Sequence, residues 1–207
     1  RACCEAAMSE LVIIDAGGAN LGSVRAAFAR LGVAPEVSRD PARIASASRL
    51  VLPGVGAAGP VMAILRDTGL DALLRTSRTR LLGVCIGMQV LFDRSEEGEV
   101  AGLGLLAGTV QRLPTAPGVR LPHMGWNRLA LRGGSPLLDG IAEGAQAYFV
   151  HSYGVPESDD AIATCTHGQP FCAAVARGHI AGAQFHPERS GEVGARFLRN
   201  FLAWQPA

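Results

Sequence analysis

One cysteine stands between two glycines at the end of an apolar segment, in the run LLGVCIGMQ over residues 81–89. The residues before Cys85 are typical of a buried strand and those after it of a helix start. Glycines at positions 83 and 87 remove the side chains that would crowd so sharp a strand-to-helix turn. The positive end of a helix dipole favours a thiolate. The run therefore predicts a nucleophile at Cys85, and the alternative is a buried, unreactive cysteine.

A cysteine nucleophile needs a base, and that base needs an orienting group. The candidates are the five histidines, His123, His151, His167, His179 and His186. Only His186 has a carboxylate at a short, fixed spacing, in the run AQFHPE over residues 183–188. The proline restricts the backbone around it, so the side chains of His186 and Glu188 should lie on the same side. The segment predicts a base and its orienting group, with a surface turn as the alternative.

Composition is typical of a single enzyme domain. The chain has 207 residues, is 48% hydrophobic and carries a net charge of +1, which gives no electrostatic footprint for nucleic acid or anionic membranes. It has no apolar run long enough to span a bilayer and no signal-peptide pattern. We expect a leader or disordered segment over residues 1–10, one domain over residues 11–207, and a cytoplasmic location.

The cysteines and the basic residues exclude several kinds of cofactor. Five cysteines without a CxxC spacing disfavour a disulfide framework and a zinc site, and Cys165 and Cys172 are expected in the core of a late hairpin. All 19 basic residues are arginine, so pyridoxal phosphate attachment, Schiff-base chemistry and a P-loop lysine are excluded. We therefore predict no cofactor and no metal.

Apolar strands and amphipathic helices alternate along the first half of the chain. Strands are predicted at residues 11–14, 49–52 and 81–84, and helices at 20–32, 61–65, 70–74 and 191–204. Later strand-like runs at 121–131, 147–155 and 173–185 predict antiparallel additions to the same sheet. The pattern indicates an α/β fold with a mostly parallel open sheet flanked by helices, whose functional groups lie at the carboxyl ends of strands.

Two glycine-rich segments follow predicted strands. The run DAGGANLG at residues 15–22 lacks the GxGxxG spacing of a dinucleotide site. The run PGVG at residues 53–56 leaves backbone N–H groups open to a ligand, and an oxyanion hole needs such donors opposite the N–H of Ile86. An ordinary strand-ending turn is the alternative.

Together, residues 83–89, 184–188 and 53–56 resemble the class I, triad-type glutamine amidotransferases, whose sheet is flavodoxin-like, and the resemblance extends over nearly the whole chain from residue 11. Within that class, PHMGWN at residues 122–127 and YFVHSY at 148–153 resemble the glutaminase subunits of imidazole glycerol phosphate synthase. The resemblance implies that glutamine is hydrolysed to glutamate and ammonia. It also implies that the ammonia passes to a cyclase subunit, in a heterodimer that makes imidazole glycerol phosphate and AICAR in histidine biosynthesis.

The same resemblance implies roles for individual residues. The triad would be Cys85, His186 and Glu188. The oxyanion hole would be formed by Gly54, Val55, Gly56 and Ile86, and glutamine would be bound by Gln89, Glu97, His151, Ser152 and Tyr153. The partner interface would include His123, Met124, Trp126, Asn127 and Arg189.

Three alternatives remain open from the sequence. A glycine between Met124 and Trp126 is also typical of a core strand. The fold is compatible with another acyl-transfer chemistry, such as a peptidase or a glutaminase for pyridoxal phosphate or anthranilate synthesis, and the PHMGWN segment argues against this. A non-catalytic binding module is the third alternative, against which the intact Cys85, His186 and Glu188 argue.

Overall fold

The computed structural model describes residues 11–17 and 20–206, so the leader expected at residues 1–10 lies outside the described residues. Its largest sheet contains eight strands: β1 Leu11–Ile14, β2 Glu36–Ser38, β3 Arg49–Gly54, β4 Arg80–Cys85, β9 Ala130–Leu131, β12 Ala161–His167, β13 Gln169–Arg177 and β14 Ile180–Ala183. The helices are α1 Leu21–Arg30, α2 Pro41–Ala45, α3 Ala58–Asp67, α4 Leu70–Thr76, α5 Ile86–Gln89 and α6 Gly191–Ala203, with short 3-10 turns η1 Pro136–Leu138 and η2 Pro187–Arg189.

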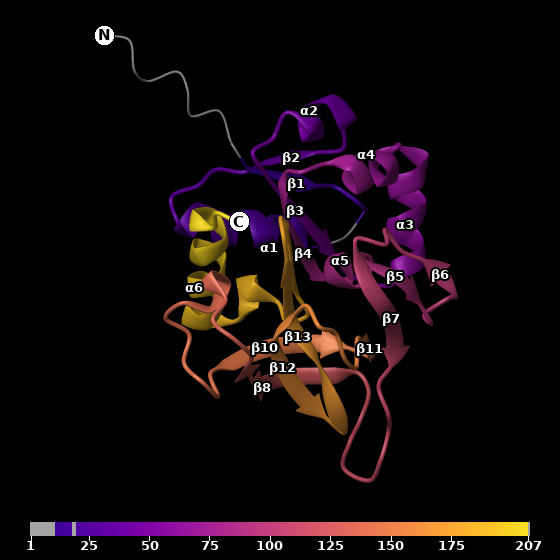
Figure 1. The fold of residues 1–207 in the computed structure, drawn as a ribbon, viewed down its shortest axis with the longest axis vertical. Coiled ribbons are helices and arrows are strands. Elements are labelled where there is room, and N and C mark those ends of the chain that lie inside the picture. The colour runs from indigo at the N-terminus through magenta and orange to yellow at the C-terminus, as the bar shows by residue number, and fades with distance from the viewer. Residues whose placement is uncertain (1–10, 18–19, 207) are drawn as a thin grey trace.

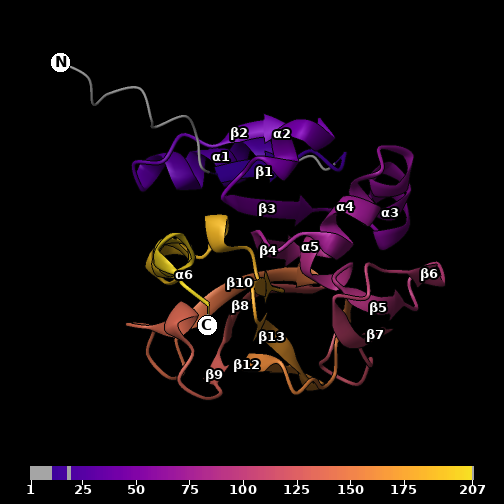
Figure 2. The ribbon, with the colours of Figure 1, turned by 45° about the horizontal axis from the view of Figure 1, so that its top comes forward.

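The strand order of the large sheet is β2-β1-β3-β4-β14-β13-β12-β9. The first five strands in this order are parallel, and each of the last three is antiparallel to its neighbour. Figures 1 and 2 show helices on both sides of the parallel part, with α6 on one side and α3 and α4 on the other. The predicted α/β fold with a mostly parallel sheet and antiparallel additions is confirmed.

The central strands are apolar because they are buried on both faces. Every residue of β1 and of β14 is buried, as expected for parallel strands covered by helices. Helix α1 packs Val24, Ala27 and Phe28 inward, which are positions on one helical face. Cys165 and Cys172 are buried in the β12–β13 hairpin, as expected.

The later strands differ from the sequence prediction, because they do not all join the large sheet. Strands β8 His123–Arg128 and β10 Gln146–His151 pair only with each other, and β5 Phe92–Ser95, β6 Val100–Ala101, β7 Leu106–Arg112 and β11 Tyr153–Gly154 form a third sheet. The β8–β10 pair instead contacts the large sheet through side chains. The rings of His123 on β8 and Phe149 on β10 each contact the Phe171 ring of β13 edge-on, with ring centroids 5.6 Å apart.

The run at 173–185 contains two strands with a turn between them. Strand β13 is antiparallel to β14, whereas β14 runs parallel to β4 with Ala183 opposite Val84. The carboxyl ends of β4 and β14 are therefore neighbours. This register brings the segment after Ala183 to the turn that holds Cys85.

The turn after β4 requires both of its flanking glycines. Cys85 has φ 55° and ψ −112°, a conformation that costs a non-glycine residue on the order of 1–3 kcal/mol. A Cβ on Gly87 would lie 1.7 Å from the carbonyl oxygen of Leu52 in β3, and one on Gly83 would lie 2.5 Å from the carbonyl oxygen of Gly87. The glycines therefore let the turn pack against its own strand and the neighbouring one.

Candidate active site

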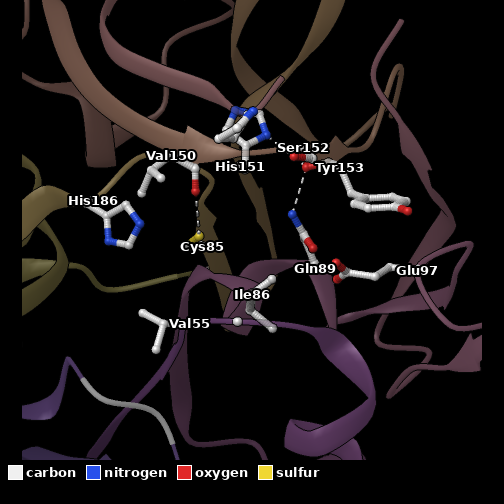
Figure 3. Close-up of a pocket in the computed structure, with 12 residues that line it drawn as sticks. Val55, Cys85, Ile86, Gln89, Glu97, Val150, His151, Ser152, Tyr153 and His186 are labelled. Atoms are coloured by element: carbon white, nitrogen blue, oxygen red, sulfur yellow. Dashed lines mark hydrogen bonds between the residues drawn. The ribbon is translucent and has the colours of Figure 1, made fainter. Parts of the chain in front are cut away.

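The predicted base lies beside the predicted nucleophile. His186 follows β14 and Cys85 ends β4, so the two residues come from adjacent strands (Figure 3). The Nδ1–H of His186 donates to Oε1 of Glu188 across 2.8 Å, and both side chains are buried, Glu188 to 1% exposure. Nε2 of His186 has no hydrogen-bond partner among the described residues. The carboxylate thus fixes the ring and leaves its second nitrogen for the reaction.

The charge environment favours a protonated His186. Burial by itself lowers the pKa of this imidazole, but its polar interactions with Cys85 and Glu188, and the negative charges of both, raise it to about 10. A raised histidine pKa means that the imidazolium form is stabilised in the folded protein. The site therefore places an imidazolium beside Cys85, which is the partner that a cysteine nucleophile uses.

Two further groups contact the thiol. When protonated, the Cys85 S–H donates to the carbonyl oxygen of Val150 on β10, with a sulfur-to-oxygen distance of 3.9 Å. The Nε2 of Gln184 donates to the sulfur across 3.8 Å. Both distances are long, as bonds to sulfur are, and they fix the thiol between β10 and the segment after β14.

The structure adds a residue that the sequence analysis missed. The side-chain amide of Asn20 donates to the same Glu188 oxygen that accepts from His186. Asn20 precedes α1 but forms no side-chain cap with it. The sequence pattern indicated only a helix start, and the contact with a residue near the other end of the chain carries no local signal. Asn20 thus helps to orient the carboxylate.

A cavity of about 280 Å³ opens beside the thiol (Figure 3). It is lined by Val55, Gly56, Cys85, Ile86, Gln89, Glu97, Pro122, Val150, His151, Ser152, Tyr153 and His186. All five residues predicted to bind substrate lie on its wall, together with three of the four predicted around the oxyanion. The fourth, Gly54, packs against Ile86 and Gly87 instead, where a Cβ would approach to 2.8 Å. Pro122 and Val150 were not predicted.

Polar groups on the cavity wall are positioned for a ligand. The Nε2 of Gln89 donates to the carbonyl oxygen of Tyr153 across 2.8 Å and to Oε1 of Gln184 across 3.0 Å, whereas its own Oε1 has no partner among the described residues. Burial raises the pKa of Glu97, against a bond from the Ala58 N–H that lowers it. A cationic or N–H group of a ligand would satisfy both.

A protein-family model, "Glutamine amidotransferase class-I", matches residues 12–204. The chain belongs to the class I glutamine amidotransferases. It is 56% identical over 200 residues to "Imidazole glycerol phosphate synthase subunit HisH" of Xylella fastidiosa strain Temecula1, covering 97% of this chain and 100% of that one. The same subunit of Xanthomonas oryzae pv. oryzae strain MAFF 311018 is 55% identical over 195 residues, covering 94% and 98%. This amidotransferase is thus a HisH-type family member.

Solved structures support the fold of this amidotransferase. A crystal structure of a glutamine amidotransferase superposes with a TM-score of 0.73 at 20% identity, covering 93% of this chain and 97% of that one. The structure of PurLQS from Thermotoga maritima gives a TM-score of 0.70 at 19% identity, again covering 93% and 97%. No helix among the described residues of the amidotransferase is long and apolar enough to cross a membrane.

The residues predicted at a partner interface differ in their exposure. Met124 and Trp126 are two positions apart on β8 and so lie on the same face of the strand. They are 63% and 54% exposed, so the core alternative for them is wrong. The Arg189 guanidinium lies 4.7 Å from the centre of the Tyr148 ring, which contacts Trp126 edge-on. Asn127 is half-buried. His123 points inward and is only 4% exposed.

The amidotransferase should hold His186 as an imidazolium at pH 8, and Glu188→Gln should lower the pKa of His186, because the desolvation stays while a negative charge is lost. The check is an NMR titration of the histidine side chains. The pKa of His186 is raised from 6.5 to about 10 on folding. The favourable interactions of the imidazolium therefore add fully to the free energy of unfolding below pH 6.5, and this contribution is lost as the pH rises toward about 10.

The matched control for this titration is Glu192→Gln on the exposed side of α6, which should leave the pKa of His186 unchanged. His123 and His151 serve as internal references, because burial lowers their pKa values to about 4 and about 3. A neutral His186 at pH 8 in the wild-type protein would contradict the raised pKa of this residue.

Proposed function

We propose that this chain hydrolyses glutamine through Cys85, His186 and Glu188 and delivers the ammonia to the cyclase subunit of imidazole glycerol phosphate synthase in histidine biosynthesis. The observation that carries the proposal is the left-handed turn at Cys85, which lies beside a histidine whose other nitrogen is bonded to a buried carboxylate. Family membership and the HisH relatives support the same function.

The chemistry follows from acyl transfer. The Cys85 thiolate attacks the side-chain amide carbon of glutamine and forms a tetrahedral intermediate. His186, as the imidazolium, gives its Nε2 proton to the amide nitrogen, so that the C–N bond breaks and ammonia leaves. Water then loses a proton to His186 and attacks the thioester, which releases glutamate and regenerates the thiol. Glu188 orients His186, and Asn20 orients Glu188.

Both tetrahedral intermediates place a negative charge on the former carbonyl oxygen. We assign its stabilisation to the backbone N–H groups around Val55, Gly56 and Ile86, which lie on the cavity wall beside the thiol. Gly54 contributes through packing, because its missing side chain lets β3 approach the turn after Cys85. Losing one such donor should slow turnover by about a hundredfold or more.

Recognition of glutamine is assigned to the rest of the wall. The unpartnered Oε1 of Gln89 accepts an N–H of the substrate, and the Glu97 carboxylate pairs with the α-ammonium group. His151, Ser152 and Tyr153 close the opposite side of the cavity (Figure 3). The pairing of Glu97 with a cation would offset the burial that raises its pKa.

The cyclase subunit is proposed to bind at the face of β8. Met124 and Trp126 expose large apolar side chains there, and Arg189 and Tyr148 extend the surface toward the segment that carries His186. Large exposed apolar side chains near a catalytic site are typical of protein interfaces.

The three free cysteines among the described residues support a reducing, cytoplasmic setting. We take residues 11–207 as one domain.

Cys85→Ala should abolish ammonia release from glutamine, because the variant lacks the proposed nucleophile. The same variant in complex with the cyclase should still make product when ammonia is added. Ammonia is measured with glutamine, with and without the cyclase, and Cys165→Ala is the matched control, since Cys165 is a buried thiol in β12 outside the cavity. Glutamine hydrolysis by Cys85→Ala would disprove the nucleophile.

Trp126→Ala should weaken binding of the cyclase by about 2 kcal/mol, roughly 30-fold in Kd, because an aromatic anchor at an interface contributes that much. The melting temperature should change little, since more than half of the side chain is exposed. Titration calorimetry measures the first quantity and thermal unfolding the second. Val37→Ala, at an exposed apolar position on β2, should leave the affinity unchanged. An unchanged affinity of Trp126→Ala for the cyclase would contradict the proposed interface.

A further inference from the structure

Three histidine rings meet behind the exposed face of β8. Nδ1 of His123 lies 3.0 Å from Nε2 of His151, and both side chains are buried. Nδ1 of His151 lies 2.8 Å from the carbonyl oxygen of Tyr153, and Nε2 of His123 lies 3.1 Å from the side-chain amide nitrogen of Asn127. The His167 ring stacks on His123 at 4.2 Å but bonds elsewhere, to the carbonyl oxygen of Arg120.

The direction of each hydrogen bond follows from the one group that can only accept. The Tyr153 carbonyl oxygen accepts, so Nδ1 of His151 carries the proton and its Nε2 has a lone pair. That lone pair accepts from the Nδ1–H of His123, whose own Nε2 must then accept from the Asn127 amide. The amide orientation agrees, because Asn127 Oδ1 accepts from the Arg128 N–H and Nδ2 also donates to the Thr166 carbonyl oxygen.

This arrangement requires both rings to be neutral, since a doubly protonated ring has no lone pair to accept with. Burial lowers the pKa of His123 to about 4, helped by the charge of His167, and it lowers the pKa of His151 to about 3. Both rings are therefore neutral at physiological pH. The tautomers are fixed by the network itself.

The far end of the network reaches the cavity. The Tyr153 carbonyl oxygen that accepts from His151 also accepts from Nε2 of Gln89 across 2.8 Å. Gln89 continues to Gln184, whose Nε2 donates to the sulfur of Cys85. An unbroken series of hydrogen bonds therefore connects Asn127 on β8 with the wall of the cavity and with the thiol.

We infer that His123 is a positioning residue for glutamine binding, acting through His151 on the Tyr153 carbonyl and on Gln89. This inference rests on the proposed function, because it concerns the same cavity. His123 does not line the cavity itself, and it shares β8 with Met124 and Trp126, which face the opposite way. These hydrogen bonds connect the strand that exposes Met124 and Trp126 with the residues proposed to hold the substrate.

Packing alone does not call for a histidine at this position. The ring lies between Phe149, at 4.9 Å and nearly parallel, and His167, in surroundings that a phenylalanine ring would also fill. Burying two imidazoles costs free energy unless their polar atoms are bonded, and here each nitrogen of both rings has a partner. We call the hydrogen bonds from Asn127 through His123 and His151 to the Tyr153 carbonyl the relay. His123→Phe keeps the ring stacking and breaks the relay.

The test is the steady-state kinetics of glutamine hydrolysis by the complex with the cyclase. His123→Phe removes the bond to His151 and the bond from Asn127. Because the bond to His151 is the one that orients the binding wall, the KM for glutamine should rise about tenfold and kcat should fall less. His123→Asn keeps an N–H donor near Nδ1 and should return KM to within about threefold of the wild-type value. His167→Phe, the same change in the stacked ring outside the relay, should leave KM unchanged.

Two outcomes would overturn the inference while glutamine hydrolysis by the wild type is intact. One is an unchanged KM in His123→Phe, and the other is an equal rise in His167→Phe. A second measurement does not depend on turnover: nitrogen chemical shifts should show the Nδ1–H tautomer for both His123 and His151 in the folded protein. An Nε2–H tautomer at either ring would overturn the relay, whether or not the chain hydrolyses glutamine. A lack of glutamine hydrolysis would instead refute the proposed function.

Discussion

The close approach of three backbone segments around Cys85 is the constraint on which the site depends. Strand β3 contacts the turn after β4 so tightly that a methyl group on Gly87 would overlap the Leu52 carbonyl, and Gly83 and Gly54 are packed almost as closely. This packing supports the φ of 55° at Cys85, which an isolated chain would avoid. The thiol is therefore held at the carboxyl end of the central strand β4 by tightly packed backbone, not by a flexible loop.

The parallel pairing of β14 with β4 then determines the chemistry. It brings His186 beside Cys85, while Pro187 and the short turn after it return Glu188 to the ring. Burial of this group of residues strengthens the effect of each charge, so the imidazolium persists despite its desolvation. Burial likewise keeps His123 and His151 neutral, and the charges of neighbouring histidines lower their pKa values further. Histidines in one molecule thus acquire opposite protonation states from their surroundings.

Local sequence patterns predicted the parts of this structure that depend on short-range rules. Apolar runs located β1, β3 and β4, the glycines around Cys85 indicated its turn, and the His-Pro-Glu segment indicated the ring and its orienting carboxylate. Long-range contacts were not predictable in this way. Three features depend on which surfaces meet after folding: the contact of Asn20 with Glu188, the separation of β8 and β10 from the large sheet, and the inward position of His123. The spacing of residues along the chain does not predict these contacts.

The most direct test of Cys85 as the nucleophile is reaction of the complex with an electrophilic glutamine analogue, followed by peptide mass spectrometry. We predict that, among Cys85, Cys165 and Cys172, the adduct forms on Cys85 alone and that glutamine prevents it by competition, because burial raises the pKa of the Cys165 and Cys172 thiols to about 12 and about 11. Labelling spread over these three cysteines, or labelling of Cys85 that glutamine does not slow, would contradict this assignment.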